Sequence, residues 1–135
     1  MKFVQTNDAP SAIGPYSQAV VAGGMVYTSG QIALTPEGIM SENDVAVQTR
    51  QVLKNLKAVL QEAGSSLDMV VKTTIFIADM DDFVTINEIY EEVFGSHKPA
   101  RSTVAVKTLP KNALVEIDAI ALLYYHPNKL TQFLM

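Results

Sequence analysis

The chain has 135 residues, enough for one domain with its own core, and its hydrophobic fraction of 48% is typical of a globular protein. The absence of cysteine excludes disulfide bonds, thiolate metal ligands and cysteine nucleophiles, and it favours a cytoplasmic location. A net charge of −4 disfavours nucleic-acid binding, and no run of residues is apolar enough to indicate membrane insertion.

Short strands are predicted in the first part of the chain. Residues 2–6 form a first candidate strand. Residues 17–22 and 25–29 alternate around a two-glycine turn, which is typical of a β-hairpin. Residues 31–34 are expected to extend the second strand of this hairpin.

A long amphipathic helix is predicted over residues 44–63. Apolar side chains recur there every three or four positions, while charged side chains occupy the opposite side. Ser41 or Asn43 is expected to cap its start, because short polar side chains accept hydrogen bonds from the first free N–H groups. Gly64 stands where a glycine commonly ends a helix.

A strand and a second helix follow the long helix. Residues 70–78 are rich in β-branched side chains and predict a strand. The second helix is expected to start at Asp81 or Asp82, to continue through Phe94 and to end at Gly95.

The last two predicted strands carry unexpected charges. A hairpin with residues 109–112 as its loop would place Thr103 opposite Asp118. Side-chain alternation would then bring Arg101, Thr103, Glu116 and Asp118 onto one face of the sheet. Such charges are costly in an apolar strand unless they are paired or used.

The predicted order β-β-β-α-β-α-β-β indicates a single α+β domain with a mixed sheet. Two helices suffice to cover only one face of that sheet. The other face would carry Val70, Lys72, Thr74 and Phe76, or their neighbours, together with the charged set. Because a half-apolar open face is a liability on a monomer, we expect an oligomer with its sites at the subunit boundaries.

Arg101 and Glu116 are the strongest candidates for a site, and each has two interpretations. The planar guanidinium of Arg101 suits a carboxylate ligand, but it could instead form a structural ion pair with Glu116 or Asp118. Glu116 could position a water molecule as a general base, or it could be the other half of that pair. Asp118 is interpreted as structural, and Thr103 adds a hydroxyl to the same group.

Other candidates lie earlier in the chain. Tyr16 follows a Gly-Pro turn and either presents its phenol to a site or packs. Gly30, after Ser29, permits close backbone approach to a ligand or marks a β-bulge. Asn87 on the second helix either turns its amide inward or faces solvent.

Metal and cofactor chemistry have no motif in this sequence. His97 and His126 stand in polar or terminal stretches without companion ligands. No glycine-rich loop follows a strand and opens a helix, so no nucleotide site is predicted.

These residues in combination resemble the reactive-intermediate deaminase A family, also called the YjgF/YER057c/UK114 family. The matching segments, in order, are Ala12-Ile13-Gly14-Pro15-Tyr16, Thr28-Ser29-Gly30-Gln31, Gln48-Thr49-Arg50-Gln51-Val52-Leu53, Val71-Lys72-Thr73-Thr74, Phe83-Val84-Thr85-Ile86-Asn87, Pro99-Ala100-Arg101-Ser102, and Leu109-Pro110 through Val115-Glu116-Ile117-Asp118-Ala119. The resemblance spans residues 9–123 and is specific because its segments occur together and in order.

The resemblance implies a chorismate-mutase-like α+β fold that assembles into trimers around a central barrel, with ligand sites between subunits. It implies hydrolysis of 2-imino acids such as 2-iminobutanoate and 2-iminopropanoate, in equilibrium with enamines, to 2-keto acids and ammonia. These substrates are released by pyridoxal-phosphate dehydratases. The family protein itself uses no metal or cofactor.

The resemblance also implies roles for particular residues. Arg101 would bind the substrate carboxylate, and Glu116 would position the attacking water together with Thr103. The pocket around the imine would be lined by Tyr16, Ser29 and Gly30, with Asn87 at its edge.

The sequence departs from the family pattern in three places. Thr103 stands where many members have cysteine, and Lys98 stands where members often have an aromatic residue. A single domain is expected over residues 1–135. Within it, residues 126–135 are a C-terminal extension beyond the point where family members usually end. A non-catalytic trimer that binds 2-keto acids or other small carboxylates is the alternative interpretation.

Overall fold

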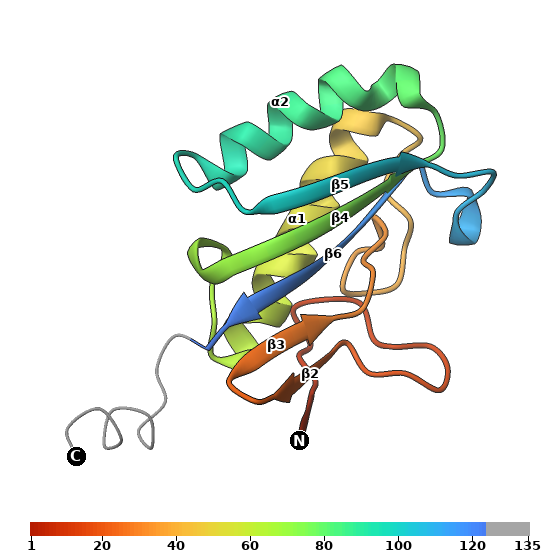
Figure 1. The fold of residues 1–135 in the computed structure, drawn as a ribbon. Helices are drawn as coiled ribbons and strands as arrows, with labels where there is room; N and C mark the ends of the chain where they lie inside the picture. Colours follow the sequence, from red (N-terminus) through yellow and green to blue (C-terminus); the bar gives the residue numbers. More distant parts are fainter. Residues whose placement is uncertain (124–135) are drawn as a thin grey trace, which may run out of the picture.

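The computed structural model describes residues 1–123, so the predicted extension at residues 126–135 lies outside the described part. The elements in chain order are β1 (Lys2–Val4), β2 (Ala19–Ala22), β3 (Met25–Thr28), α1 (Val45–Ala63), η1 (Leu67–Met69), β4 (Val70–Ile77), η2 (Met80–Asp82), α2 (Phe83–Phe94), β5 (Ala100–Ala105), η3 (Pro110–Asn112) and β6 (Val115–Leu122). The predicted order of strands and helices is confirmed (Figure 1).

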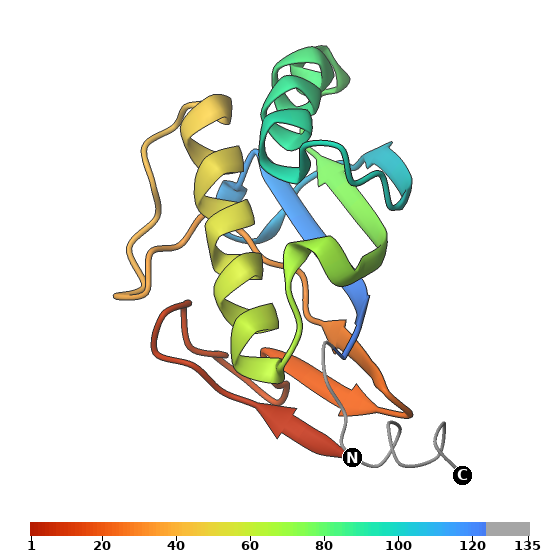
Figure 2. The same cartoon turned by 90° about the vertical axis from the view of Figure 1, so that its left-hand side faces the viewer.

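One six-stranded sheet organises the fold, in the order β1-β2-β3-β6-β4-β5. The β4–β5 pair is parallel and the other neighbours are antiparallel. Helices α1 and α2 pack side by side on the same face of this sheet (Figure 2). The mixed α+β fold with two helices on one face is therefore confirmed.

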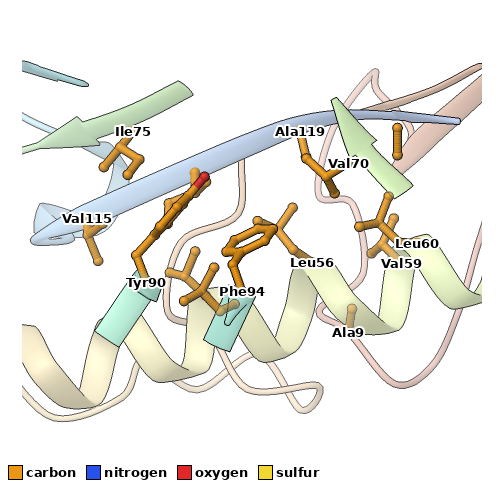
Figure 3. Close-up of a cluster of buried hydrophobic side chains, with 14 of the residues drawn as sticks. Ala9, Leu56, Val59, Leu60, Val70, Ile75, Tyr90, Phe94, Val115 and Ala119 are labelled. Carbon is orange, nitrogen blue, oxygen red and sulfur yellow. The ribbon is translucent and has the colours of Figure 1, made fainter. Parts of the chain in front are cut away.

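Helix α1 supplies much of the core. Its Leu53, Leu56 and Leu60 are almost fully buried against the sheet (Figure 3). The Oδ1 atom of Asp44 accepts a hydrogen bond from the Val47 N–H, so the cap is Asp44 rather than Ser41 or Asn43. Gly64 ends the helix in the left-handed conformation, as predicted.

The two faces of β4 and β6 differ as strand alternation requires. Ile75 and Ile117 are fully buried beneath the helices, while Phe76 and Glu116 lie half-buried on the open face. Lys72 and Thr74 are on the open face as predicted. The placement of Val70 on that face is wrong: Val70 is buried in the core, because the register shift between Val70 and Lys72 breaks the alternation at the start of β4.

The predicted hairpin between the last two strands is wrong. Strand β4 lies between β5 and β6, with Ile75 paired to Thr103 on one side and to Ile117 on the other. Arg101 and Thr103 consequently lie on the helix-covered face, whereas Glu116 and Asp118 lie on the open face. The four side chains do not share a face.

Burial explains this arrangement. The alternate residues of β6, from Val115 to Ala121, are nearly inaccessible to solvent, which requires a neighbour strand on each side and a helix above. Strand β5 has mostly exposed residues and tolerates the edge of the sheet, where charged and polar side chains are common. The turn over residues 109–112 therefore connects β5 to β6 without making them neighbours in the sheet.

Two further details complete the frame. Strand β3 ends at Thr28, and Gln31 forms only an isolated bridge with Ile117, so the predicted extension over residues 31–34 is wrong. In the described part of the chain, no helix has the length and apolar character needed to cross a membrane.

Candidate functional site

The structure divides the predicted site residues into two groups. Tyr16, Ser29, Gly30 and Glu116 line one cavity of about 550 Å³. Asn87 and Arg101 line a second cavity of about 440 Å³, next to α2. Thr103 belongs to neither lining, so a single chain does not bring all seven residues together.

Close backbone contact places Gly30 against Glu116. Gln31 and Ile117 exchange two backbone hydrogen bonds, with N–O distances of 2.9 and 3.1 Å. A Cβ atom at Gly30 would lie only 2.7 Å from the Oε2 atom of Glu116. Any side chain at position 30 would therefore have to displace this carboxylate.

Glu116 is half-buried on the open face of the sheet. Burial raises the pKa of its carboxyl group above the ordinary value, and the neighbouring charge of Asp118 raises this pKa further. A carboxylate with a raised pKa accepts a proton more readily, as a general base must. Glu116 is therefore the candidate proton acceptor among the residues that line this cavity.

Asp118 has a different environment on the same face. Burial raises its pKa, while hydrogen bonds from Thr74 and the charge of Lys72 act in the opposite direction. The Lys72 ammonium also donates to the Ser102 hydroxyl over 3.2 Å. These contacts agree with the structural interpretation of Asp118.

Tyr16 and Ser29 are held by short-range hydrogen bonds. The Tyr16 hydroxyl accepts from the Ile13 N–H over 3.3 Å, and its side chain is 54% exposed, so it does not pack in the core. The Ser29 hydroxyl donates to the Ser17 carbonyl. Each hydroxyl can form further hydrogen bonds, and both residues line the cavity.

A buried glutamine, Gln18, supports the wall of the Glu116 cavity, although no sequence pattern marks it as a site residue. The Gln18 amide nitrogen donates to the carbonyls of Thr6 and Pro10 over 3.1 and 2.9 Å, and its oxygen accepts from the Thr6 N–H over 2.7 Å. Asn55 of α1 likewise donates to the Leu34 carbonyl over 2.8 Å. These buried amides satisfy backbone groups of the neighbouring loops, which have no partners in a helix or strand.

Arg101 is held by three residues of α2. Its guanidinium donates to the Asn87 Oδ1 atom over 2.7 Å, and its central carbon lies 4.9 Å from the ring centre of Tyr90 and 5.6 Å from that of Phe83. The Tyr90 hydroxyl is itself bonded to the Thr73 hydroxyl at 2.8 Å. The group is therefore oriented, and most of its N–H donors remain available.

Arg101 makes no ion pair with Glu116 or Asp118 in the described residues. The ion pair found within 4.0 Å there joins Arg50 of α1 and Glu92 of α2, both on the surface. A structural ion pair of Arg101 with Glu116 or Asp118 is therefore absent from the described part of a single chain. An oriented guanidinium without a carboxylate partner is chemically suited to an anionic ligand.

Thr103 and His97 complete the account of the predicted residues. The Thr103 Oγ1 atom is buried and has no hydrogen-bond partner in the described residues, although buried hydroxyls rarely lack one. The His97 Nε2 atom contacts the Val70 carbonyl at 2.7 Å. Among residues 1–123, no group of three or more His, Cys, Asp or Glu side chains is placed to hold a metal ion.

Aromatic residues of α2 were missed as site residues because their spacing is also that of a buried helix face. Tyr90 and Phe94 project from α2 into the core, with ring centres 4.5 Å apart (Figure 3). Only the tertiary contact with Arg101 separates the role of Tyr90 from that of Phe94. The hydroxyl of Tyr90 was the one available sequence signal, since a buried phenol needs a partner.

The fold and these side chains define a small α+β domain with a carboxylate-bearing cavity and a separate arginine group. The chain belongs to the Endoribonuclease L-PSP family, whose profile matches residues 6–123. This result confirms the family resemblance found in the sequence.

Individual relatives cover nearly the whole described chain. A RutC family protein from Synechocystis is 54% identical over 126 residues, covering 91% of this chain and 97% of the relative. A 2-iminobutanoate/2-iminopropanoate deaminase from Escherichia coli K12 is 48% identical over 123 residues, covering 89% and 96%. The crystal structure of Escherichia coli TdcF with bound serine is 47% identical, has a TM-score of 0.86, and covers 90% of this chain and 98% of its own.

Proposed function

We propose that the protein hydrolyses 2-imino acids, such as 2-iminobutanoate and 2-iminopropanoate, to 2-keto acids and ammonia. The observation that carries this proposal is the oriented Arg101 guanidinium, which has no carboxylate partner in the described residues. The half-buried Glu116 carboxylate supplies the proton acceptor that hydrolysis requires. A relative at 48% identity with this activity supports the same assignment.

The proposed mechanism uses binding and proton transfer. Arg101 binds the substrate carboxylate with the N–H groups that Asn87 leaves available. Tyr16, Ser29 and the Gly30 backbone line the space around the imine carbon. Because a protonated imine is already a strong electrophile, orientation of the substrate and of one water supplies much of the catalysis.

Protons move through Glu116 in this mechanism. As the water oxygen bonds to C2 of the iminium, Glu116 takes one proton from the water and a neutral carbinolamine forms. Glu116 returns that proton to the nitrogen, the C–N bond breaks, and ammonia leaves. The remaining hydroxyl proton is lost as the C=O bond of the keto acid forms. The buried Thr103 hydroxyl is proposed to bind the water or the substrate.

The separation of the two groups supports a homotrimer with sites between subunits. Within one chain, Arg101 lies on the helix-covered face at the edge strand β5, while Glu116 lies on the opposite face, with β4 between them. We propose that Arg101 of one copy and Glu116 of the next form each site in a closed ring. The open sheet face, with Phe76 and the exposed Tyr27, is then covered by neighbouring copies.

Mixing two variants tests this arrangement. An equal mixture of Arg101→Ala and Glu116→Gln chains, unfolded and reassembled together, is expected to recover about a quarter of the wild-type activity, because random closed rings create that share of intact sites between unlike copies. Each variant reassembled alone is the control and is expected to keep no more than about a hundredth of the wild-type activity. If the mixture is no more active than the separate variants, each site is built from one chain.

Trapping of the imine tests the activity itself. A threonine dehydratase, with its pyridoxal phosphate, is supplied with threonine and semicarbazide, and semicarbazone formation from the released imine is followed. Added protein is expected to lower the initial rate of semicarbazone formation in proportion to its concentration, while threonine consumption stays the same. An unchanged rate at every protein concentration would contradict the proposed activity.

A second candidate is a binding module for small carboxylates. The serine bound in the Escherichia coli TdcF crystal structure favours it, since that relative is known in complex with an amino acid. Glu116 favours catalysis instead, because capture of an anion alone gains nothing from a second negative charge. Tight binding of 2-oxobutanoate without loss of trapped imine would identify the binding module.

The proposed function also implies a location and partners. We propose that the protein acts in the cytoplasm beside pyridoxal-phosphate dehydratases, where short-lived imino acids are released. No contact between proteins is required, because the imine diffuses. RNA is not proposed as a substrate, since the net charge of −4 opposes binding to a polyanion.

A further inference from the structure

The loop between β5 and β6 contains two strained residues. Lys111 and Asn112 both have φ of 55°, a left-handed conformation that residues other than glycine rarely adopt. Two such residues in succession are costly, and they persist only where the surrounding structure holds them.

Buried neighbours hold this loop in place. The N–H groups of Asn112 and Ala113 donate to the carbonyls of Leu109 and Pro110 over 3.0 and 3.1 Å. Leu109 and Ala113 are buried, and the Leu114 N–H donates to the Oε1 atom of Gln48 over 2.9 Å. Both ends of the loop are therefore fixed, and so is the backbone at Lys111.

The strained loop brings a positive charge to the Glu116 cavity. Lys111 and Glu116 are the two charged residues among those that line this cavity. Lys111 is exposed, and it forms no ion pair within 4.0 Å among residues 1–123. Lys111 therefore lies at the cavity with a charge that the described residues do not neutralise by an ion pair.

The chemistry of an anionic substrate requires such a charge. Ionised Glu116 repels the carboxylate of an imino acid, and this repulsion is strong in a partly desolvated cavity. A lysine at the cavity mouth offsets the repulsion and raises the local concentration of small anions. Lysine suits this task because its hydrated, flexible charge attracts an anion without fixing it in one geometry, as arginine does.

We propose that Lys111 is the second cation of the site, that its ammonium group receives the carboxylate of the incoming 2-imino acid, and that the strained backbone is retained because it holds Lys111 at the Glu116 cavity. This inference rests on the proposed function for the identity of the anion.

Replacement of each strained residue by glycine separates strain from charge. Both Lys111→Gly and Asn112→Gly are expected to raise the melting temperature by about 3 °C, because glycine adopts the left-handed conformation without penalty. Lys111→Gly is expected to lower kcat/KM for the imine about tenfold through KM, whereas Asn112→Gly keeps the wild-type value. Lys111→Arg keeps most of the activity, because the charge is preserved.

Salt and product binding provide independent measurements. The tenfold difference in kcat/KM between the wild-type protein and Lys111→Gly is expected to become smaller at high ionic strength, because salt screens exposed charges. Titration calorimetry with 2-oxobutanoate is expected to show the same tenfold weakening. Equal kcat/KM and equal 2-oxobutanoate affinity in Lys111→Gly and wild type would overturn the inference. A wild-type protein that hydrolyses no imine would instead overturn the proposed function, and calorimetry would still test Lys111.

Discussion

Replacement of Arg101 by alanine is expected to lower kcat/KM for imine hydrolysis about a thousandfold, equivalent to roughly 4 kcal/mol of lost transition-state binding. The loss is large because the guanidinium is held by Asn87 and by the Tyr90 ring, so its binding energy is not spent on ordering the side chain. The measurement is the semicarbazide-trapping assay over a range of imine fluxes, together with 2-oxobutanoate binding, which should become undetectable.

Two control variants test whether the loss of activity is specific to the guanidinium of Arg101. Arg50→Ala removes a surface arginine that pairs with Glu92 across the two helices, and it should leave both activity and binding unchanged. Arg101→Lys keeps the charge but loses the planar fork, so it should recover only part of the activity. Wild-type kinetics in a folded Arg101→Ala protein would remove Arg101 from the site.

Replacement of Glu116 by glutamine is expected to lower kcat about a hundredfold, because a positioned general base contributes on this scale. KM is expected to fall as well, because neutral glutamine no longer repels the substrate carboxylate. Glutamine has nearly the same shape, so the Gly30 contact and the cavity are kept. The expected pattern therefore differs from that of Lys111→Gly, which acts through KM. Full kcat in Glu116→Gln would show that another group accepts the proton.

The pH profile gives the second measurement for Glu116. The base works in its ionised form, so wild-type activity should fall as the pH drops through the pKa of Glu116, which burial and Asp118 place above the ordinary glutamate value. Asp118→Asn removes the neighbouring negative charge, lowers the pKa of Glu116 and should shift this fall to lower pH. The residual activity of Glu116→Gln should lack the fall altogether.

The roles proposed for Arg101 and Glu116 depend on the order of β5, β4 and β6 in the sheet. In the sequence, both residues stand in β-branched runs separated by a turn signal, and adjacency in the sheet was the simplest expectation. In the structure, β4 separates them and alternation places them on opposite faces. A charged pair within one chain is thereby replaced by two groups that different copies can bring together.

Contacts made across elements were also invisible in the sequence. Tyr90 and Phe94 follow the same helical periodicity, yet Tyr90 lies below Arg101 and bonds to Thr73 of β4. Lys111 resembles any loop lysine until its backbone conformation and its place at the Glu116 cavity are seen.

By itself, the sequence determined the order of strands and helices, the amphipathic character of the long helix, the glycine ends of both helices and the family. These features depend on periodicity and on residues that are near neighbours along the chain, so local patterns are sufficient to predict them. Tertiary structure alone decided the strand order, the partners of Arg101 and the placement of Lys111. Those features depend on how buried area is shared over the entire sheet, and residues such as Val115 and Ile117 gain more from a central strand position than from a short hairpin with β5.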